Sequence, residues 1–113
     1  MRWALLFAFL LWGCSKGPQA DLPSIGEARS LGAEWALVNE QAAKGQLTSI
    51  YTETMRKMLR EQLQSAQGSL TQPHSNYGHE IAALLQQPDD AAPAALRAHA
   101  DKLKQIEDGL ESA

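Results

Sequence analysis

The sequence predicts an all-α protein, a small up-down bundle of about four helices arranged as two αα-hairpins. Two observations lead to this fold class. Alanine, glutamine, leucine and glutamate dominate the chain after residue 14, and all four have high intrinsic helix propensity. Apolar residues in the same part recur every three or four positions, the spacing that places them on one face of a helix.

Length and composition limit both the size of the core and the class of partner. A chain of 113 residues is long enough for one domain. After Cys14, only 17 of 99 residues are Leu, Ile, Val or Phe, so the core is small. The same part has 9 Lys and Arg against 13 Asp and Glu, which argues against a nucleic-acid partner. We expect a marginal core, which self-association would help to complete.

The first helix is predicted over residues 24–44, at the start of a single helical domain that spans 24–113. Ser24 with Glu27 three positions later matches a capping box. The inner face of this helix carries Ile25, Ala28, Leu31, Trp35, Val38 and Ala42. Asn39 lies at the edge of this face, where we expect a half-buried amide that fixes the helix register.

A second helix is predicted over residues 48–67. Gly45 ends the first helix, and Thr48 is suited to cap the second. The inner face of the second helix is predicted to carry Tyr51, Met55, Met58, Leu59, Gln62, Leu63 and Ala66. Because the connecting turn is short, the two helices should pack antiparallel.

Two further helices follow a loop over residues 68–76. The third is short and ends at Pro88; its apolar face carries Tyr77, Ile81, Leu84 and Leu85. The fourth begins near Pro93, and its apolar stripe carries Leu96, His99, Leu103, Ile106 and Leu110. Within that stripe His99 is expected to be buried and hydrogen-bonded. The alternative architecture is one long hairpin with a loosely attached C-terminal pair.

Residues 1–13 have the layout of a secretory signal peptide. Arg2 supplies the positive charge, and ten apolar residues follow it over 3–12. As a helix these ten residues reach only ~15 Å, half of a ~30 Å hydrocarbon core. The segment therefore predicts export and not a permanent membrane span.

The signal ends in Leu11-Trp12-Gly13-Cys14, which resembles the lipobox of bacterial lipoproteins. The resemblance implies that Cys14 is alkylated with a diacylglyceryl group and becomes the first residue of the mature chain. Two or three acyl chains would then hold it firmly on a membrane. Cys14 is also the only cysteine, so it cannot form an internal disulfide. In that family, a residue such as Ser15 in place of aspartate after the cysteine implies the periplasmic face of the outer membrane; the alternatives are the inner membrane and a soluble periplasmic form.

Residues 14–23 are predicted to form the lipidated cysteine and a flexible tether. The segment contains one glycine and two prolines and has almost no apolar content. Nine extended residues reach ~30 Å, enough to lift a small domain clear of the lipid headgroups.

The mature part shows no recognisable catalytic motif. His74, His79 and His99 include no pair at i, i+4 spacing, so a metal site has little support, and no cofactor is expected. Serine has no nucleophile-elbow context, and no phosphate-binding glycine loop is present. The predicted function is that of a non-enzymatic accessory or protein-interaction module. The alternatives are a small-ligand-binding periplasmic lipoprotein and, less favoured, an enzyme.

Five residues are candidates for contact with an envelope protein. Leu37 and Ile50 lie off the apolar faces of their helices. Arg56, Lys57 and Arg60 form a short basic strip on the predicted outer face of the second helix. The alternative for the strip is a solvated surface in which Lys57 pairs with acidic residues four positions away on either side.

Overall fold

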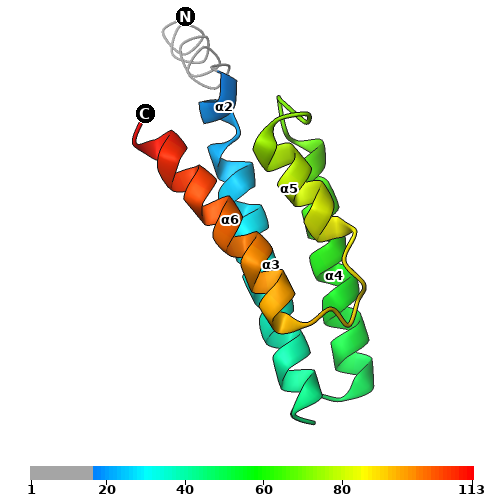
Figure 1. Cartoon of the computed structure of the whole chain (residues 1–113). Coiled ribbons are helices and arrows are strands. Elements are labelled where there is room, and N and C mark those ends of the chain that lie inside the picture. Colours follow the sequence, from blue (N-terminus) through cyan, green and yellow to red (C-terminus); the bar gives the residue numbers. More distant parts are fainter. Residues whose placement is uncertain (1–16) are drawn as a thin grey trace, which may run out of the picture.

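The computed structural model describes residues 17–113, which form α-helices and contain no strand (Figure 1). The predicted signal peptide, Cys14 and the first residues of the predicted tether lie outside the described part. The helices are α2 (Gly17–Ala20), α3 (Leu22–Ala43), α4 (Ser49–Gly68), α5 (Asn76–Leu85) and α6 (Pro93–Glu111). The all-α prediction is confirmed. None of these helices has the length and apolar content needed to span a bilayer.

The flexible tether predicted over residues 14–23 is wrong for the part that the structure describes. The short helix α2 begins at Gly17, and α3 begins at Leu22 with Pro23 in its first turn, where a missing backbone N–H leaves no hydrogen bond broken. Asp21, between the two helices, is only 1% exposed. The segment is ordered by tertiary hydrogen bonds to Asp21, which the local composition does not reveal.

The ends of the first hairpin are set by local chemistry. Gly45 has φ +70°, the left-handed conformation that ends α3, as predicted. The Thr48 hydroxyl accepts a hydrogen bond of 3.1 Å from the backbone N–H of Tyr51 and caps α4, also as predicted. The predicted capping box at Ser24 is wrong, because α3 has already begun two residues earlier.

The loop before α5 folds back tightly against the first turn of that helix. Ser75 caps α5 by accepting a hydrogen bond of 3.1 Å from the backbone N–H of Gly78. A Cβ atom on Gly78 would lie 2.2 Å from the carbonyl oxygen of Pro73. Only glycine permits this approach, which fixes the position of α5 relative to the end of α4.

The central element of the bundle is α3, which contacts α4 on one side and α6 on the other, while α5 packs against α4 and α6 (Figure 1). The two predicted hairpins, α3–α4 and α5–α6, are therefore confirmed. The C-terminus lies at the same end as α2, and the α3–α4 turn lies at the opposite end. At that opposite end the tip of the α3–α4 hairpin extends beyond the α5–α6 connection.

The core is built from residues of α3, α4, α5 and α6. Trp35 and Tyr77 are 1% and 2% exposed, as predicted for core aromatic residues. The other large side chains that are fully buried and apolar are Ile25, Leu59, Leu63, Ile81, Leu84, Leu96 and Leu103.

The buried face of α4 differs from the predicted one by a rotation about the helix axis. Leu59, Leu63 and Ala66 are buried as predicted, but Tyr51, Met58 and Gln62 are exposed. Thr52 is buried instead, and its hydroxyl donates a hydrogen bond of 2.8 Å to the carbonyl of Thr48. The rotation brings the opposite edge of α4, with Arg56 and Arg60, against neighbouring elements.

Candidate functional site

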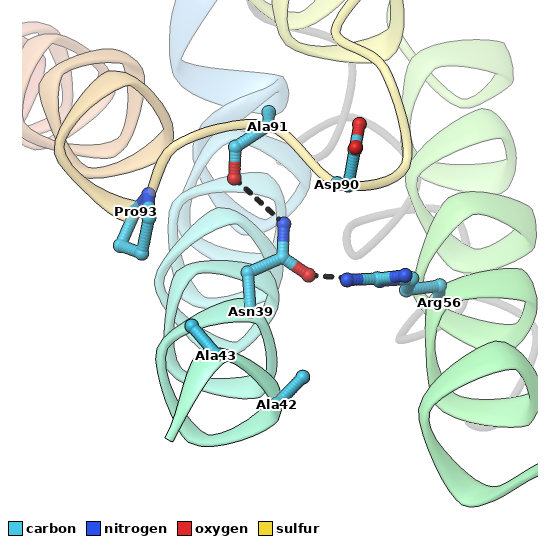
Figure 2. A pocket seen from close by; sticks show the side chains of 7 residues that line it. All are labelled: Asn39, Ala42, Ala43, Arg56, Asp90, Ala91 and Pro93. Carbon is cyan, nitrogen blue, oxygen red and sulfur yellow. Dashed lines mark hydrogen bonds between the residues drawn. The ribbon is translucent and has the colours of Figure 1, made fainter. Parts of the chain in front are cut away.

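The polar seam consists of Trp35, Asn39, Arg56, Arg60 and Asp89, and it joins the α3–α4 hairpin to the α5–α6 connection. The Asn39 side chain is 5% exposed. Its amide nitrogen donates to the carbonyl of Asp89 (3.0 Å). The same nitrogen donates to the carbonyl of Ala91 (2.8 Å), and the side-chain oxygen accepts a hydrogen bond of 2.8 Å from Nε of Arg56 (Figure 2). These three hydrogen bonds are the contacts that Asn39 needs to fix the register of α3, as predicted.

Arg60 uses its whole guanidinium group inside the seam. It donates to the carbonyls of Leu85 (2.7 Å) and Gln87 (2.9 Å) and to the Asp89 carboxylate (2.8 Å). The group also lies 4.8 Å from the ring centroid of Trp35, within cation–π range. Arg60 therefore fastens the α5–α6 connection to the hairpin.

The prediction that Arg56, Lys57 and Arg60 form an exposed basic strip on the outer face of α4 is wrong. Arg56 and Arg60 are half-buried in the seam, and of the three residues only Lys57 is exposed. The cause is the rotation of α4 described above, together with backbone carbonyls of the α5–α6 connection that no sequence pattern places. No ion pair within 4.0 Å joins Lys57 to an acidic residue of 17–113.

Leu37 and Ile50 are 51% and 77% exposed, as expected for residues off the apolar faces. Two further large apolar side chains, Tyr51 (51%) and Met58 (40%), are exposed although the sequence pattern placed them in the core. All four lie on the α3–α4 hairpin. Within residues 17–113, α5 and α6 expose no comparable side chain.

Two neighbouring pockets lie beside the seam, toward the end of the bundle that holds the α3–α4 turn; we call this end the free end and the two pockets together the groove. Its first part has a volume of about 300 Å³ and is lined by Asn39, Ala42, Ala43, Arg56, Asp90, Ala91 and Pro93 (Figure 2). Its second part, about 270 Å³, is lined by Ala42, Leu47, Ser49, Thr52, Glu53 and Arg56. The two parts share Ala42 and Arg56. In Figure 2 the Asp90 carboxylate points away from Asn39 and Arg56.

The histidine on α6 lies outside this groove. His99 is half-buried, with a side chain that is 24% exposed, and not fully buried as predicted. Its Nδ1 lies 2.5 Å from a Glu80 carboxylate oxygen and its Nε2 lies 3.3 Å from the Gln87 amide nitrogen. Both ring nitrogens thus have polar partners on neighbouring elements, which is the hydrogen-bonded role that was expected.

The described residues bring three carboxylates together near the end of α6. Oxygen atoms of Glu107, Asp108 and Glu111 lie within 4.8 Å of one another. Glu107 is already paired with Arg29 at 2.8 Å, and the other two side chains are exposed. This arrangement is that of an ordinary solvated helix end.

A buried carboxylate fixes the other end of the bundle. Asp21 accepts hydrogen bonds from the Tyr77 hydroxyl (2.6 Å), from the Thr71 backbone N–H (2.8 Å) and hydroxyl (3.0 Å), and from the Gln72 backbone N–H (3.2 Å). Burial alone would raise the pKa of Asp21, but the hydrogen bonds led by Tyr77 outweigh it and hold the pKa below the usual value. Burial and the bond to Asp21 raise the pKa of Tyr77.

We expect Asp21→Asn to destabilise the bundle by about 2 kcal/mol at pH 7, because the amide presents a donor group to donors. A lowered pKa contributes stability that is present above the unfolded-state pKa of ~3.9 and is lost as the pH falls through the folded-state pKa. The difference between wild type and variant should therefore shrink below about pH 4. Urea unfolding of a chain beginning at Ser15, at pH 7 and pH 3, measures it. Asp101→Asn, at an exposed carboxylate on α6, is the control, and an equal deficit at both pH values would contradict the prediction.

No family model, curated protein or solved structure matches the chain.

Proposed function

We propose that this chain is a lipid-anchored helical module of the cell envelope that works by binding another protein and not by catalysing a reaction. The observation that carries the binding role is the distribution of exposed apolar side chains. All four large ones among residues 17–113 lie on the α3–α4 hairpin: Leu37, Ile50, Tyr51 and Met58. Three of the four lie on α4 and one on α3, and exposed apolar side chains that adjoin on the surface of a small domain are typical of a protein contact surface.

The position of the hairpin relative to the anchor supports this role. Only Ser15 and Lys16 separate Cys14 from the start of α2, so lipid on Cys14 would hold the α2 end of the bundle close to the membrane. The 22-residue α3 then runs ~33 Å toward the hairpin tip. Ile50 and Tyr51, next to the tip, would then lie at the end of the bundle that is farther from the headgroups, within reach of an envelope protein.

The interior chemistry of the bundle supports a non-catalytic role. Within residues 17–113, every buried side-chain nitrogen and oxygen atom has a hydrogen-bond partner. The buried groups Asp21 and Asn39 and the half-buried Arg60 hold helices and loops together, so their polar atoms serve folding. The residues that line the groove supply neither histidine nor cysteine.

The proposed location is the periplasmic face of the outer membrane, on the basis of Ser15 after the lipobox cysteine. Attachment to the inner membrane and a soluble periplasmic form are the alternatives. Membrane fractionation of cells that express the full chain separates these three locations.

The second candidate function is binding of a small ligand, and the groove of about 300 Å³ beside Arg56 is the observation that favours it.

Site-specific photo-crosslinking in intact cells tests the binding role. A photo-reactive residue in place of Ile50 should give a discrete crosslinked product with an envelope protein, whereas the same residue at exposed Asp101 on α6 should not. With the label at Ile50, Tyr51→Ser should reduce that product at least about tenfold, since interface hot spots each contribute more than ~1.4 kcal/mol. The substitution should leave the fold intact because Tyr51 is 51% exposed. Identical products from both label positions would contradict the proposal.

A further inference from the structure

We infer that the groove at the free end of the bundle receives the C-terminal end of a partner polypeptide, with its free carboxylate on Arg56 and a small aliphatic side chain against the alanine-lined wall. This inference rests on the proposed binding function and names the chemistry of the partner.

Arg56 is held in place from the side of the seam. Its Nε donates to the Asn39 oxygen at 2.8 Å, and the Asn39 amide is itself fixed by two backbone carbonyls of the α5–α6 connection, those of Asp89 and Ala91. The guanidinium is therefore oriented before any ligand arrives. Such preorganisation lowers the entropic cost of binding.

The terminal nitrogens of Arg56 are the unused donors of the seam. They make no hydrogen bond or ion pair within residues 17–113, whereas those of Arg60 reach Leu85, Gln87 and Asp89. Arg56 lines both parts of the groove. A planar guanidinium with two free amino groups matches the geometry of a carboxylate.

The walls beside Arg56 select the group attached to that carboxylate. Ala42, Ala43, Ala91 and Pro93 are small and apolar, and a volume of about 300 Å³ is at the lower end of ligand sites. The Asp90 side chain, although part of the lining, directs its carboxylate away from Arg56 (Figure 2). A C-terminal residue carries its carboxylate and its side chain on the same carbon atom. The carboxylate can therefore reach Arg56 while the side chain contacts the apolar wall of the same pocket.

The second part of the groove continues from Arg56 toward the α3–α4 turn and provides space for the preceding residues of the peptide. Ser49 and Glu53 in its lining are exposed and polar, and Leu47 adds an apolar contact. Backbone amides of a peptide can hydrogen-bond to such groups. A peptide end, with a polar backbone behind a small apolar terminal residue, therefore fits the two parts of the groove in sequence.

Peptide titration of the full chain in detergent micelles, followed by two-dimensional NMR of backbone amides, tests the inference. N-acetyl-Ala-Ala-Ala with a free carboxylate should shift the amide signals of Ala43 and Ala91, and its C-terminal amide form should bind at least about tenfold more weakly. Acetyl-Ala-Asp-Ala-amide, which carries its carboxylate on a side chain, should also bind more weakly. Equal binding of all three peptides, or no binding of the free acid, would overturn the inference.

Three variants locate the site. Arg56→Gln should abolish binding of the free acid, and Arg56→Lys should weaken it several-fold because a lysine lacks the paired donors. Ala43→Leu, at an exposed position in the groove, should block binding by filling the pocket without changing charge. Arg97→Gln, on α6 outside the groove, is the matched control and should bind like the wild type. Unchanged binding by both Ala43→Leu and Arg56→Lys would overturn the assignment.

The result separates this inference from the proposed function. If Ile50 crosslinks to a protein but the free acid does not bind, the interaction role stands and the assignment of a carboxylate site is wrong. If the free acid binds at Arg56 but no protein crosslinks, the groove remains a site for free peptides and the adaptor role fails.

Discussion

Replacing Cys14 by serine is expected to abolish lipid attachment completely. A serine hydroxyl is a far weaker nucleophile than a thiolate and does not form the thioether, so neither the acyl chains nor the cut before residue 14 should appear. In a Gram-negative host, the wild-type chain should incorporate labelled palmitate and lose its first 13 residues. The Cys14→Ser chain should carry no label and keep its full length, as measured by mass spectrometry.

A second substitution at the neighbouring position controls for general export defects. Ser15→Asp should leave the label and the cleavage unchanged, but it should move the protein from the outer to the inner membrane fraction if the sorting rule implied by the lipobox resemblance holds. The anchor would be refuted if wild type and Cys14→Ser were both unlabelled and entered the detergent phase equally. A conventionally cleaved soluble protein would then be the remaining interpretation.

The sequence predicts the hairpin well where structure depends on local chemistry. The stop at Gly45 and the cap at Thr48 follow from backbone conformation and from a side-chain hydrogen bond within one turn. The apolar face of α3 and the burial of Trp35 follow from helical periodicity alone. These features depend on residues within a few positions of one another, so the local sequence is sufficient to predict them.

The prediction fails where polar residues meet across the bundle. Asp21 lies in a segment with the composition of a tether, and it is buried only because Thr71 and Tyr77, 50 and 56 positions away, donate to it. The sequence pattern predicts that Arg60 faces solvent, but its guanidinium binds backbone carbonyls at the end of α5 and in the segment after it. Long-range hydrogen bonds of this kind leave no periodic signal in a single sequence.

The sequence predicts single residues of the candidate site but not their arrangement, for the same reason. The position of Asn39 at the edge of an apolar stripe predicts a half-buried amide that fixes the helix register. Its partners, and the consequence that Arg56 is held with two amino groups free, depend on where the α5–α6 connection crosses the hairpin. The groove therefore arises from tertiary packing and has no counterpart in any sequence motif.

Trp35 marks the point where the core and the polar seam meet, and Trp35→Ala is expected to cause the largest loss of stability among substitutions in the bundle. Its side chain is 1% exposed, and its Nε1–H donates a hydrogen bond of 2.9 Å to the Asp89 carbonyl. Removing a buried tryptophan typically costs about 3–5 kcal/mol, and the cation–π contact with Arg60 is lost as well. A small domain with few large apolar residues has a stability near the lower end of ~5–15 kcal/mol, so the variant should keep no more than about 2 kcal/mol and be measurably unfolded at 37 °C.

Two further substitutions on α3 separate the contributions of Trp35. Trp35→Phe should cost less than Trp35→Ala because a ring remains beside Arg60, and the Asp89 carbonyl still accepts a hydrogen bond from Asn39 at 3.0 Å. Leu37→Ala, at a side chain that is 51% exposed, should change the free energy of unfolding by no more than about 0.5 kcal/mol. Urea unfolding followed by far-ultraviolet circular dichroism on a chain beginning at Ser15 measures all three. A loss below about 1 kcal/mol for Trp35→Ala would mean that the seam and the core beneath it do not form as described. The hydrogen bonds that orient Arg56 in the groove would then not form either.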